Sequence, residues 1–499
     1  MRLEIYNLRT TYITPAAQEK WSLIEFNKTA EKNKSTESTI AIHNDHISIE
    51  NKITGTSEIY ARISKDSIKI SPHLLEVIDS NTRVSRQAIL RYLNNRKALG
   101  DTIWEGVFTI GIGVLAKISK EPRIHFHEIP IPKTNGDPAD RLTNIISARV
   151  KNQKVLIRFS GGLDSTSILT TCASVTETKN LLALTWFSKF DGASADLTNS
   201  TKIAKALNIE HHLIEIDEES LFQITATQSL PGYPTPALAF SKFLETLNDY
   251  SIRHFNGITP VILDGHGGDH IFLEYIDPFM LRSCVGRGFF RKIKEYCQLN
   301  ATEFLKTTSK IIKGRDPENL NILHKRYRTG SWPRYFMTSP RSMRKNIIRE
   351  ALDEIGAPKM HQESKIFYPL LHPLMIGCAL SYNLAELFNA TNSRIPLRSS
   401  LSKKFGAELF NQACKGAVTS SFQKSLAIQR KHLTNLVTNG YCASNNLIDT
   451  EAFKETYETS ARGINDINYE LMKIIMLELL ISHTHRRIGR RHENETIHT

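Results

Sequence analysis

Two glycine-rich turns carry the residue types that could bind phosphate and a metal ion. In the first, an apolar segment at residues 155–159 leads directly into the sequence SGGLDS at residues 160–165. Glycines let backbone amides approach an anion closely, and the N-terminus of the following helix adds partial positive charge. We therefore expect phosphate binding by the small and hydroxyl residues of this turn: Ser160, Gly161, Gly162 and Ser165.

Asp164 lies within this turn, where a carboxylate would repel a bare phosphate. Its presence is explained if it holds a Mg²⁺ ion that bridges the phosphates of a nucleotide. A second turn, DGHGGDHIF at residues 264–272, follows another apolar segment and contains Asp269. We expect Asp164 and Asp269 to share the Mg²⁺ ion. Gly267 and Gly268 are expected to contribute to nucleotide binding.

Histidines in and around these turns leave other interpretations open. His266 and His270 could form a transition-metal site with the aspartates. His266 alone could orient a carboxylate or accept a proton, and it could equally serve only to pack the turn. His125 and His127 alternate along a strand-like segment, which favours a shared strand face over a metal site.

Alternating strand and helix patterns surround the first turn and predict a parallel sheet. A helix is expected to begin at Asp137, which can cap it, with Pro138 in the first helical position. A second buried strand follows at residues 181–188, then a helix and a third strand within residues 195–216, with His211 and His212 in the turn between them. In such sheets ligands bind beyond the carboxyl ends of the strands, where the first turn lies.

The remaining sequence suggests further organisation. Residues 1–120 show short alternating segments typical of β-rich structure, and we place a domain boundary near residue 130. The second domain extends to residue 485, and residues 486–499 are expected to form a basic polar tail. The apolar stretch at residues 467–481 predicts a core-packing helix, or alternatively a partner-binding helix.

Composition limits the classes of protein that this chain can represent. It has 499 residues, 40% of them apolar, six cysteines without a CxxC pair, and a formal net charge of +13. We therefore predict a cytoplasmic protein with reduced thiols and no membrane span, because no apolar run approaches about 20 residues. The positive charge suits a polyanionic partner, but the basic C-terminal run lacks interleaved aromatic residues, so no nucleic-acid partner is predicted.

The first turn lacks the lysine of a P-loop and resembles the SGGxDS loop of the ATP pyrophosphatase family, which cleaves ATP between the α- and β-phosphates. The order of SGGLDSTSIL, the helix and strand of residues 195–216, and DGHGGDHIF resembles the asparagine synthetase superfamily. Residues 366–383, 393–406 and 414–426 are similar to its C-terminal helical region. By this resemblance Lys415, which precedes Gly416, stabilises negative charge on the reacting group.

The resemblance implies an α/β fold: a β-rich, degenerate glutaminase-like (Ntn-type) domain at residues 1–130, then a parallel-sheet ATP pyrophosphatase domain with a helical C-terminal region. The N-terminal similarity lies in residues 86–110. In relatives that hydrolyse glutamine, a cysteine follows Met1, whereas this chain has Arg2, which lacks a nucleophilic atom. The activity expected from the resemblance is an AMP-forming, ATP-dependent carbon–nitrogen ligase that uses ATP and Mg²⁺.

Histidine in the second turn makes the sequence most similar to lasso-peptide cyclases. This resemblance implies that an Asp or Glu side chain of a ribosomally made precursor peptide is adenylated and then attacked by the peptide's N-terminal amine. A leader peptidase would be the partner protein. Three alternatives remain open: an ammonia-dependent ligase acting on a small acid, a tRNA-modifying enzyme with the same ATP loop, and an inactive scaffold for the precursor peptide.

Overall fold

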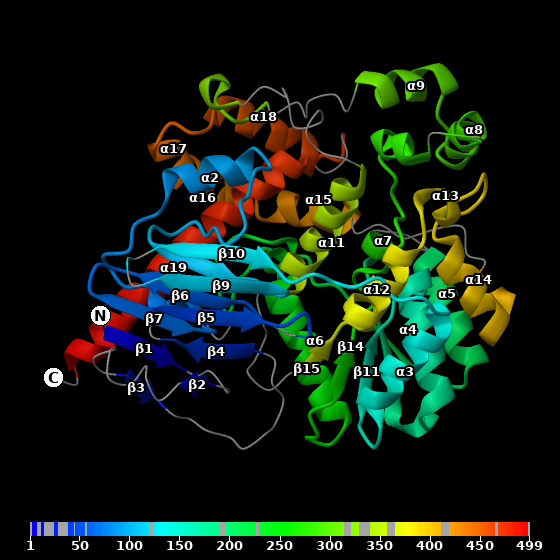
Figure 1. The fold of residues 1–499 in the computed structure, drawn as a ribbon. Coiled ribbons are helices and arrows are strands. Elements are labelled where there is room, and N and C mark those ends of the chain that lie inside the picture. The colour runs from blue at the N-terminus through cyan, green and yellow to red at the C-terminus, as the bar shows by residue number, and fades with distance from the viewer. Residues whose placement is uncertain are drawn as a thin grey trace.

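The computed structural model describes most of the chain (Figure 1). It leaves out residues 1, 7–10, 14–23, 28–37, 44, 55–56, 120, 122, 190–194, 226–228, 285, 287, 314–320, 329–339, 357–364, 411–418, 465–467 and 498–499. An N-terminal β-rich region lies beside a parallel sheet with helices on both faces, and a group of C-terminal helices packs against both. The expected fold class is confirmed.

The N-terminal region consists of two five-stranded sheets with strand orders β3-β1-β7-β6-β8 and β10-β9-β5-β4-β2. Alternating isoleucines build the core between the sheets, and Ile40, Ile42, Ile47 and Ile49 are fully buried. The strands are β1 (Arg2–Tyr6), β2 (Thr11–Ile13), β3 (Ile24–Asn27), β4 (Ser38–Ile42), β5 (His46–Asn51), β6 (Ile59–Ile63), β7 (Ser67–Ser71), β8 (Val107–Ile110), β9 (Val114–Ser119) and β10 (Ile124–Glu128).

The second half of the fold is built on a parallel sheet with the order β13-β12-β11-β14-β15. Its strands are β11 (Val155–Arg158), β12 (Leu181–Phe187), β13 (Glu210–Glu215), β14 (Val261–Leu263) and β15 (Lys365–Phe367). The expected capped helix is confirmed as α3 (Pro138–Val150), in which Asp137 accepts hydrogen bonds from the amides of Ala139 and Asp140. His211 and His212, expected in a turn, lie within β13 instead.

Each face of the parallel sheet belongs to a different core. Leu156, Leu182 and Leu184 point to one face, and Val155, Ile157 and Ala183 point to the other, as the two-residue period of a strand requires. Helices near the sheet include α4 (Leu163–Val175), α5 (Ala195–Ala206), α6 (Ser241–His254), α7 (Gly268–Ile271), α11 (Pro340–Gly356), α12 (Pro373–Ser381), α13 (Leu384–Leu387) and α14 (Ile395–Phe405). Two more, α8 (Phe289–Leu299) and α9 (Phe304–Lys313), lie farther out in Figure 1.

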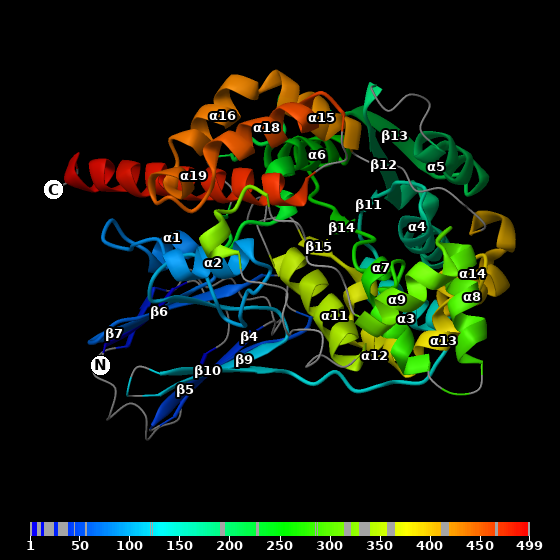
Figure 2. The same cartoon turned by 90° about the horizontal axis from the view of Figure 1, so that it is seen from above.

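The C-terminal helices join the two halves of the molecule. They are α15 (Thr419–Ile428), α16 (Arg430–Thr438), α17 (Tyr441–Ser444), α18 (Thr450–Ala461) and α19 (Tyr469–Ile497). Figure 2 shows α19 running between this group and the N-terminal helices α1 (Leu74–Val77) and α2 (Arg86–Leu93). Leu471, Ile474 and Leu480 are fully buried, which confirms the expected core-packing helix.

Helix α19 continues without interruption past residue 485 to Ile497, so the segment expected to be a polar tail begins as helix. This follows from its sequence, because residues 486–497 contain no proline that would end the helix. Among the described helices, none has the length and apolar character needed to cross a bilayer.

Candidate active site

The two glycine-rich turns meet at the carboxyl ends of two paired strands. The first turn follows β11 and the second follows β14, and these strands are neighbours at the point where the order of the parallel sheet reverses. Loops diverge at such a switch point and leave room for a ligand between them. The arrangement brings the predicted phosphate-binding residues and both predicted metal ligands to one edge of the sheet.

The first turn is held in shape by its own polar groups. The Ser165 hydroxyl accepts a hydrogen bond from the Ser160 amide at 3.2 Å and donates one to the Gly162 carbonyl at 3.3 Å. Gly161 has a φ of +76°, and a Cβ atom there would lie 2.7 Å from the Ser200 amide nitrogen of α5. Only glycine fits both the backbone conformation and this close approach.

The second turn packs directly against the first. A Cβ atom on Gly268 would lie 2.2 Å from a carboxylate oxygen of Asp164, and one on Gly265 would lie 2.9 Å from the Ser165 amide nitrogen. Gly267 has a φ of +98°, which other residues rarely adopt. The glycines therefore let the two turns come into contact.

An ion pair behind the turns couples the two strand ends. Arg158, the last residue of β11, contacts the carboxylate of Asp264 at 3.0 Å, and both side chains are largely buried. Asp264 also accepts a hydrogen bond from the His266 amide at 2.9 Å. The first aspartate of DGHGGD is thus a structural residue that shapes the turn.

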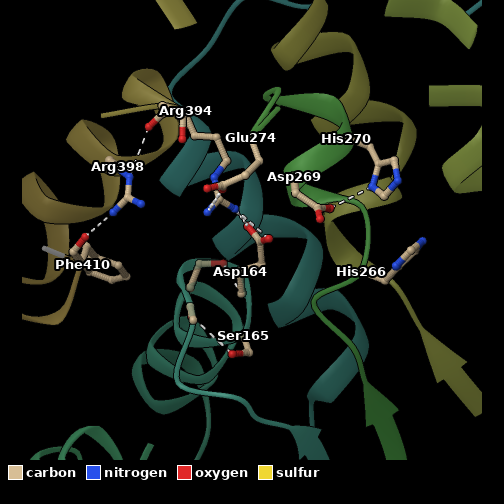
Figure 3. Close-up of polar contacts among 12 residues, drawn as sticks. Asp164, Ser165, His266, Asp269, His270, Glu274, Arg394, Arg398 and Phe410 are labelled. Carbon is tan, nitrogen blue, oxygen red and sulfur yellow. Dashed lines mark hydrogen bonds and ion pairs between the residues drawn. The ribbon is translucent and has the colours of Figure 1, made fainter. Parts of the chain in front are cut away.

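Arg394 is the central cation of the site, and it was not among the residues predicted from the sequence. Its Nη1 contacts both carboxylate oxygens of Asp164 at 2.8 Å, and its Nη2 pairs with Glu274 (Figure 3). The residue is only 4% exposed. Burial lowers its pKa, but the carboxylates of Asp164, Glu274 and Asp269 more than offset burial and raise the pKa above its ordinary value.

Asp269 lies on α7, where its carboxylate helps to raise the pKa of Arg394, and one of its oxygens lies 2.8 Å from His270 Nδ1. Three carboxylates thus surround one guanidinium, which leaves an excess of negative charge. Carboxylate oxygens in a partly buried, negatively charged cluster are ligands that suit Mg²⁺. The donor set of Asp164 and Asp269 therefore fits the expected ion, although Asp164 must share its oxygens with Arg394.

His266 points away from Asp164 in Figure 3 and forms an ion pair with Glu354 of α11, with Nε2 and the carboxylate oxygen 2.9 Å apart. Burial lowers the pKa of His266, yet the neighbouring carboxylates, Glu354 first among them, raise it above its ordinary value overall. His266, His270 and Glu354 place potential ligand atoms within 4.8 Å of one another. The pairing of His266 with Glu354 joins residues 88 positions apart in the sequence and was not predicted.

The structure treats Lys415 and Arg398, both in the helical C-terminal region, differently. Lys415 lies outside the described residues, so its expected role stays a prediction. Arg398 donates hydrogen bonds to the carbonyls of Ser393 and Phe410, at 3.2 and 2.6 Å, and it therefore anchors backbone on either side of α14. The signal for Arg394 was its place in the SRIP sequence, directly before a proline-initiated helix.

Among the comparisons with known proteins, a family model gives the informative match. The family model described as asparagine synthase matches residues 139–482. No curated protein matches the chain in sequence.

Three solved structures match parts of the chain at low sequence identity and low TM-score. An NMN synthetase from Francisella tularensis is 16% identical, with 28% of this chain and 58% of that chain covered and a TM-score of 0.19. An NH3-dependent NAD synthetase from Campylobacter jejuni subsp. jejuni NCTC 11168 is 15% identical, with 45% and 98% covered and a TM-score of 0.24. A U34-tRNA thiolase from Methanococcus maripaludis is 14% identical, with 66% and 80% covered and a TM-score of 0.25. The match to the first of these spans less than two thirds of that protein's length.

Proposed function

Because the chain belongs to the asparagine synthase family and is therefore an ATP-dependent ligase, we propose that it joins a carboxylate to an amine through an acyl-adenylate. The observation that carries the proposal is the contact between the two glycine turns at the switch point of the sheet. In the first step a substrate carboxylate oxygen attacks the α-phosphorus of ATP, and the bond to the β-phosphate breaks. Pyrophosphate leaves with the bonding electron pair.

The first turn supplies the binding site for the departing pyrophosphate. Ser160 is exposed at the end of β11, and the N-terminus of α4 directs its dipole and backbone amides toward the same edge of the sheet. Asp164 and Asp269 would hold Mg²⁺, which neutralises charge on the phosphates when bound. Arg394 positions Asp164 by contacting both of its carboxylate oxygens.

In the second step the substrate amine attacks the acyl carbon, and AMP leaves with the electron pair of the acyl–oxygen bond. The nitrogen must lose a proton during this attack. We propose His266 as the proton acceptor, since the carboxylates around it, Glu354 first among them, raise its pKa, although its ring must turn from Glu354 to face the substrate. Lys415 is proposed to stabilise the negative charge of the adenylate, which a fixed cation can do by several kcal/mol in a water-excluded site.

For the substrate, we propose a peptide that carries both reacting groups, as in a lasso-peptide macrolactam. The six cysteines all lie at or beyond residue 172, so the N-terminal β-rich region contains no thiol that could release ammonia from glutamine. An amine already present on the substrate removes the need for that reaction. A leader peptidase that frees the peptide's N-terminus would then be the natural partner.

The test combines purified full-length protein, ATP and Mg²⁺ with a candidate core peptide bearing a free N-terminus. We expect AMP and pyrophosphate in equal amounts, together with a peptide product lighter by one water. A peptide with an acetylated N-terminus is the matched control and should allow pyrophosphate release without cyclisation. Formation of ADP would contradict the adenylate mechanism. AMP formation only with a small acid and ammonium would contradict the peptide substrate and favour an ammonia-dependent ligase.

A further inference from the structure

Three potential metal ligands gather where the edge strand β13 meets helix α6. Glu210 and His212 are two residues apart on β13 and therefore share one face of the strand. Tyr250 and His254 are four residues apart on α6 and share one face of the helix. The helix face covers the strand face, so side chains from two elements converge on one point.

The distances within this group are those of a site that needs little adjustment to bind an ion. His212 Nε2 lies 2.9 Å and His254 Nε2 lies 3.7 Å from carboxylate oxygens of Glu210. All three ligand atoms fall within 4.8 Å of one another. For bonds of about 2.0–2.1 Å in tetrahedral geometry, ligand atoms stand roughly 3.3 Å apart. Side-chain movements of about an ångström would reach this arrangement.

A second contact fixes the orientation of one ligand. His212 Nδ1 lies 2.6 Å from the hydroxyl of Tyr250. If Nδ1 carries the proton and donates to Tyr250, the lone pair of Nε2 faces Glu210 and His254, which is the state required of a metal ligand. Metal-binding histidines typically have their other ring nitrogen held by such a partner.

We propose that Glu210, His212 and His254 bind a divalent transition-metal ion of the Zn²⁺ type, with the fourth position left for water. Two imidazoles and one carboxylate suit this class of ion, whereas Mg²⁺ and Ca²⁺ prefer oxygen ligands. The side chains are 52%, 30% and 21% exposed in that order, so an ion can reach the site from solvent. This proposed metal site does not depend on the proposed ligase activity.

The location gives the ion a structural role. Glu210 is the first residue of β13, whereas the glycine turns lie beyond the carboxyl ends of β11 and β14. The ion would join α6 to the edge strand β13 and so hold the helix against that face of the sheet.

The experiment titrates Zn²⁺ and Co²⁺ into metal-free full-length protein that carries His266→Gln, which disables the separate cluster of His266, His270 and Glu354. Calorimetry should find one Zn²⁺ site per chain, and Co²⁺ should give the visible absorption of a tetrahedral site. His254→Gln and, separately, Glu210→Gln should each weaken binding at least tenfold and abolish the cobalt spectrum. Tyr250→Phe should weaken Zn²⁺ binding about tenfold, as loss of a partner to a ligand does.

The matched control is the double substitution His125→Gln and His127→Gln, which removes two exposed histidines with the same strand spacing from β10. This control should leave the zinc affinity unchanged. Glu210 is about half exposed, so its substitution tests the site without disturbing a core. Absence of a zinc site in the starting protein, or equal affinity in the Glu210→Gln and control proteins, would overturn the proposal.

Discussion

Arg394 and Asp164 are 230 residues apart in the sequence, yet Nη1 of the arginine contacts both oxygens of the aspartate at 2.8 Å. The arginine reaches this position because it adopts a left-handed conformation, with a φ of 56°, at the start of α14. The contact joins the helical region to the first glycine turn. It makes the position of the Asp164 carboxylate depend on a residue that does not belong to either turn.

Arg394→Met should strongly destabilise the protein and abolish activity. It removes a buried cation and leaves Asp164 and Glu274 without its charge, and breaking a buried ion pair costs about 3–5 kcal/mol. Unfolding in denaturant measures the free energy of unfolding of each variant. Lys404→Met, which removes an exposed partner of Asp140, is the control and should change stability by less than about 1 kcal/mol. Equal stability of the two variants would contradict the importance of the buried pair.

Gly268→Ala should lower the rate of AMP formation at least tenfold while the protein remains folded. The added methyl would meet the carboxylate of Asp164 at 2.2 Å and push apart the two turns. Steady-state assays measure the rate of AMP formation, and circular dichroism checks that the protein remains folded. Gly489→Ala adds a methyl where no atom lies within 4 Å and should leave the activity unchanged. A fully active Gly268→Ala protein would show that the contact between the turns is dispensable.

Removal of Mg²⁺ with a chelator should stop the reaction, and Asp269→Asn should raise the Mg²⁺ concentration required for half-maximal activity by at least tenfold. The amide keeps the size of the side chain but loses the charge that attracts the ion. Asp249→Asn, which alters an exposed carboxylate on α6, should leave this concentration unchanged. If both variants respond to Mg²⁺ like the original protein, Asp269 is not a ligand.

Glu354→Gln should slow amide formation while leaving the first step intact. Without its carboxylate, His266 loses the group that orients it and raises its pKa. Exchange of radioactive pyrophosphate into ATP reports the first step, and product mass reports the second. Glu303→Gln, at an exposed residue directly before α9, provides the comparison. Loss of both steps in Glu354→Gln would point to a structural role instead.

Protonation of His211 should lower the free energy of unfolding at acidic pH. Burial lowers its pKa, and its Nε2 lies 2.8 Å from the Thr185 hydroxyl. The folded form therefore binds a proton less readily than the unfolded form, in which the histidine has a pKa of about 6.5. The stability that depends on neutral His211 is thus fully present above the unfolded pKa and is lost as the pH falls from there through the lower folded pKa. Unfolding of His211→Gln should depend less steeply on pH between about 7.5 and 5.5 than unfolding of the original protein.

Local patterns in the sequence predicted the elements that depend on local chemistry. The capped start of α3 and the buried helix α19 were both identifiable, because caps and apolar periodicity are short-range signals. His211 and His212 were misplaced because β13 is a polar edge strand whose alternation is hidden by charged and histidine residues. The end of α19 was missed because a polar helix surface and a polar tail have the same composition.

The sequence predicted the two glycine-rich turns of the site but not the side chains that pack against them. Its two turns are contiguous motifs, and each contains its own glycines and aspartate. Arg394, Glu274 and Glu354 reach the site through tertiary packing, and no spacing rule relates them to the turns. Arginine and glutamate are exposed at most positions in proteins, so only the fold distinguishes these residues from their exposed counterparts.

The position of α19 also has a consequence for synthesis on the ribosome. Residues 471–481 complete a core that includes side chains of α1, α2 and the parallel sheet, which are translated hundreds of codons earlier. Those apolar surfaces are not covered by α19 until this helix emerges from the exit tunnel. The nascent chain is therefore a candidate client for chaperones throughout elongation, and a premature stop codon shortly before residue 471 should yield an aggregation-prone product rather than a shorter enzyme.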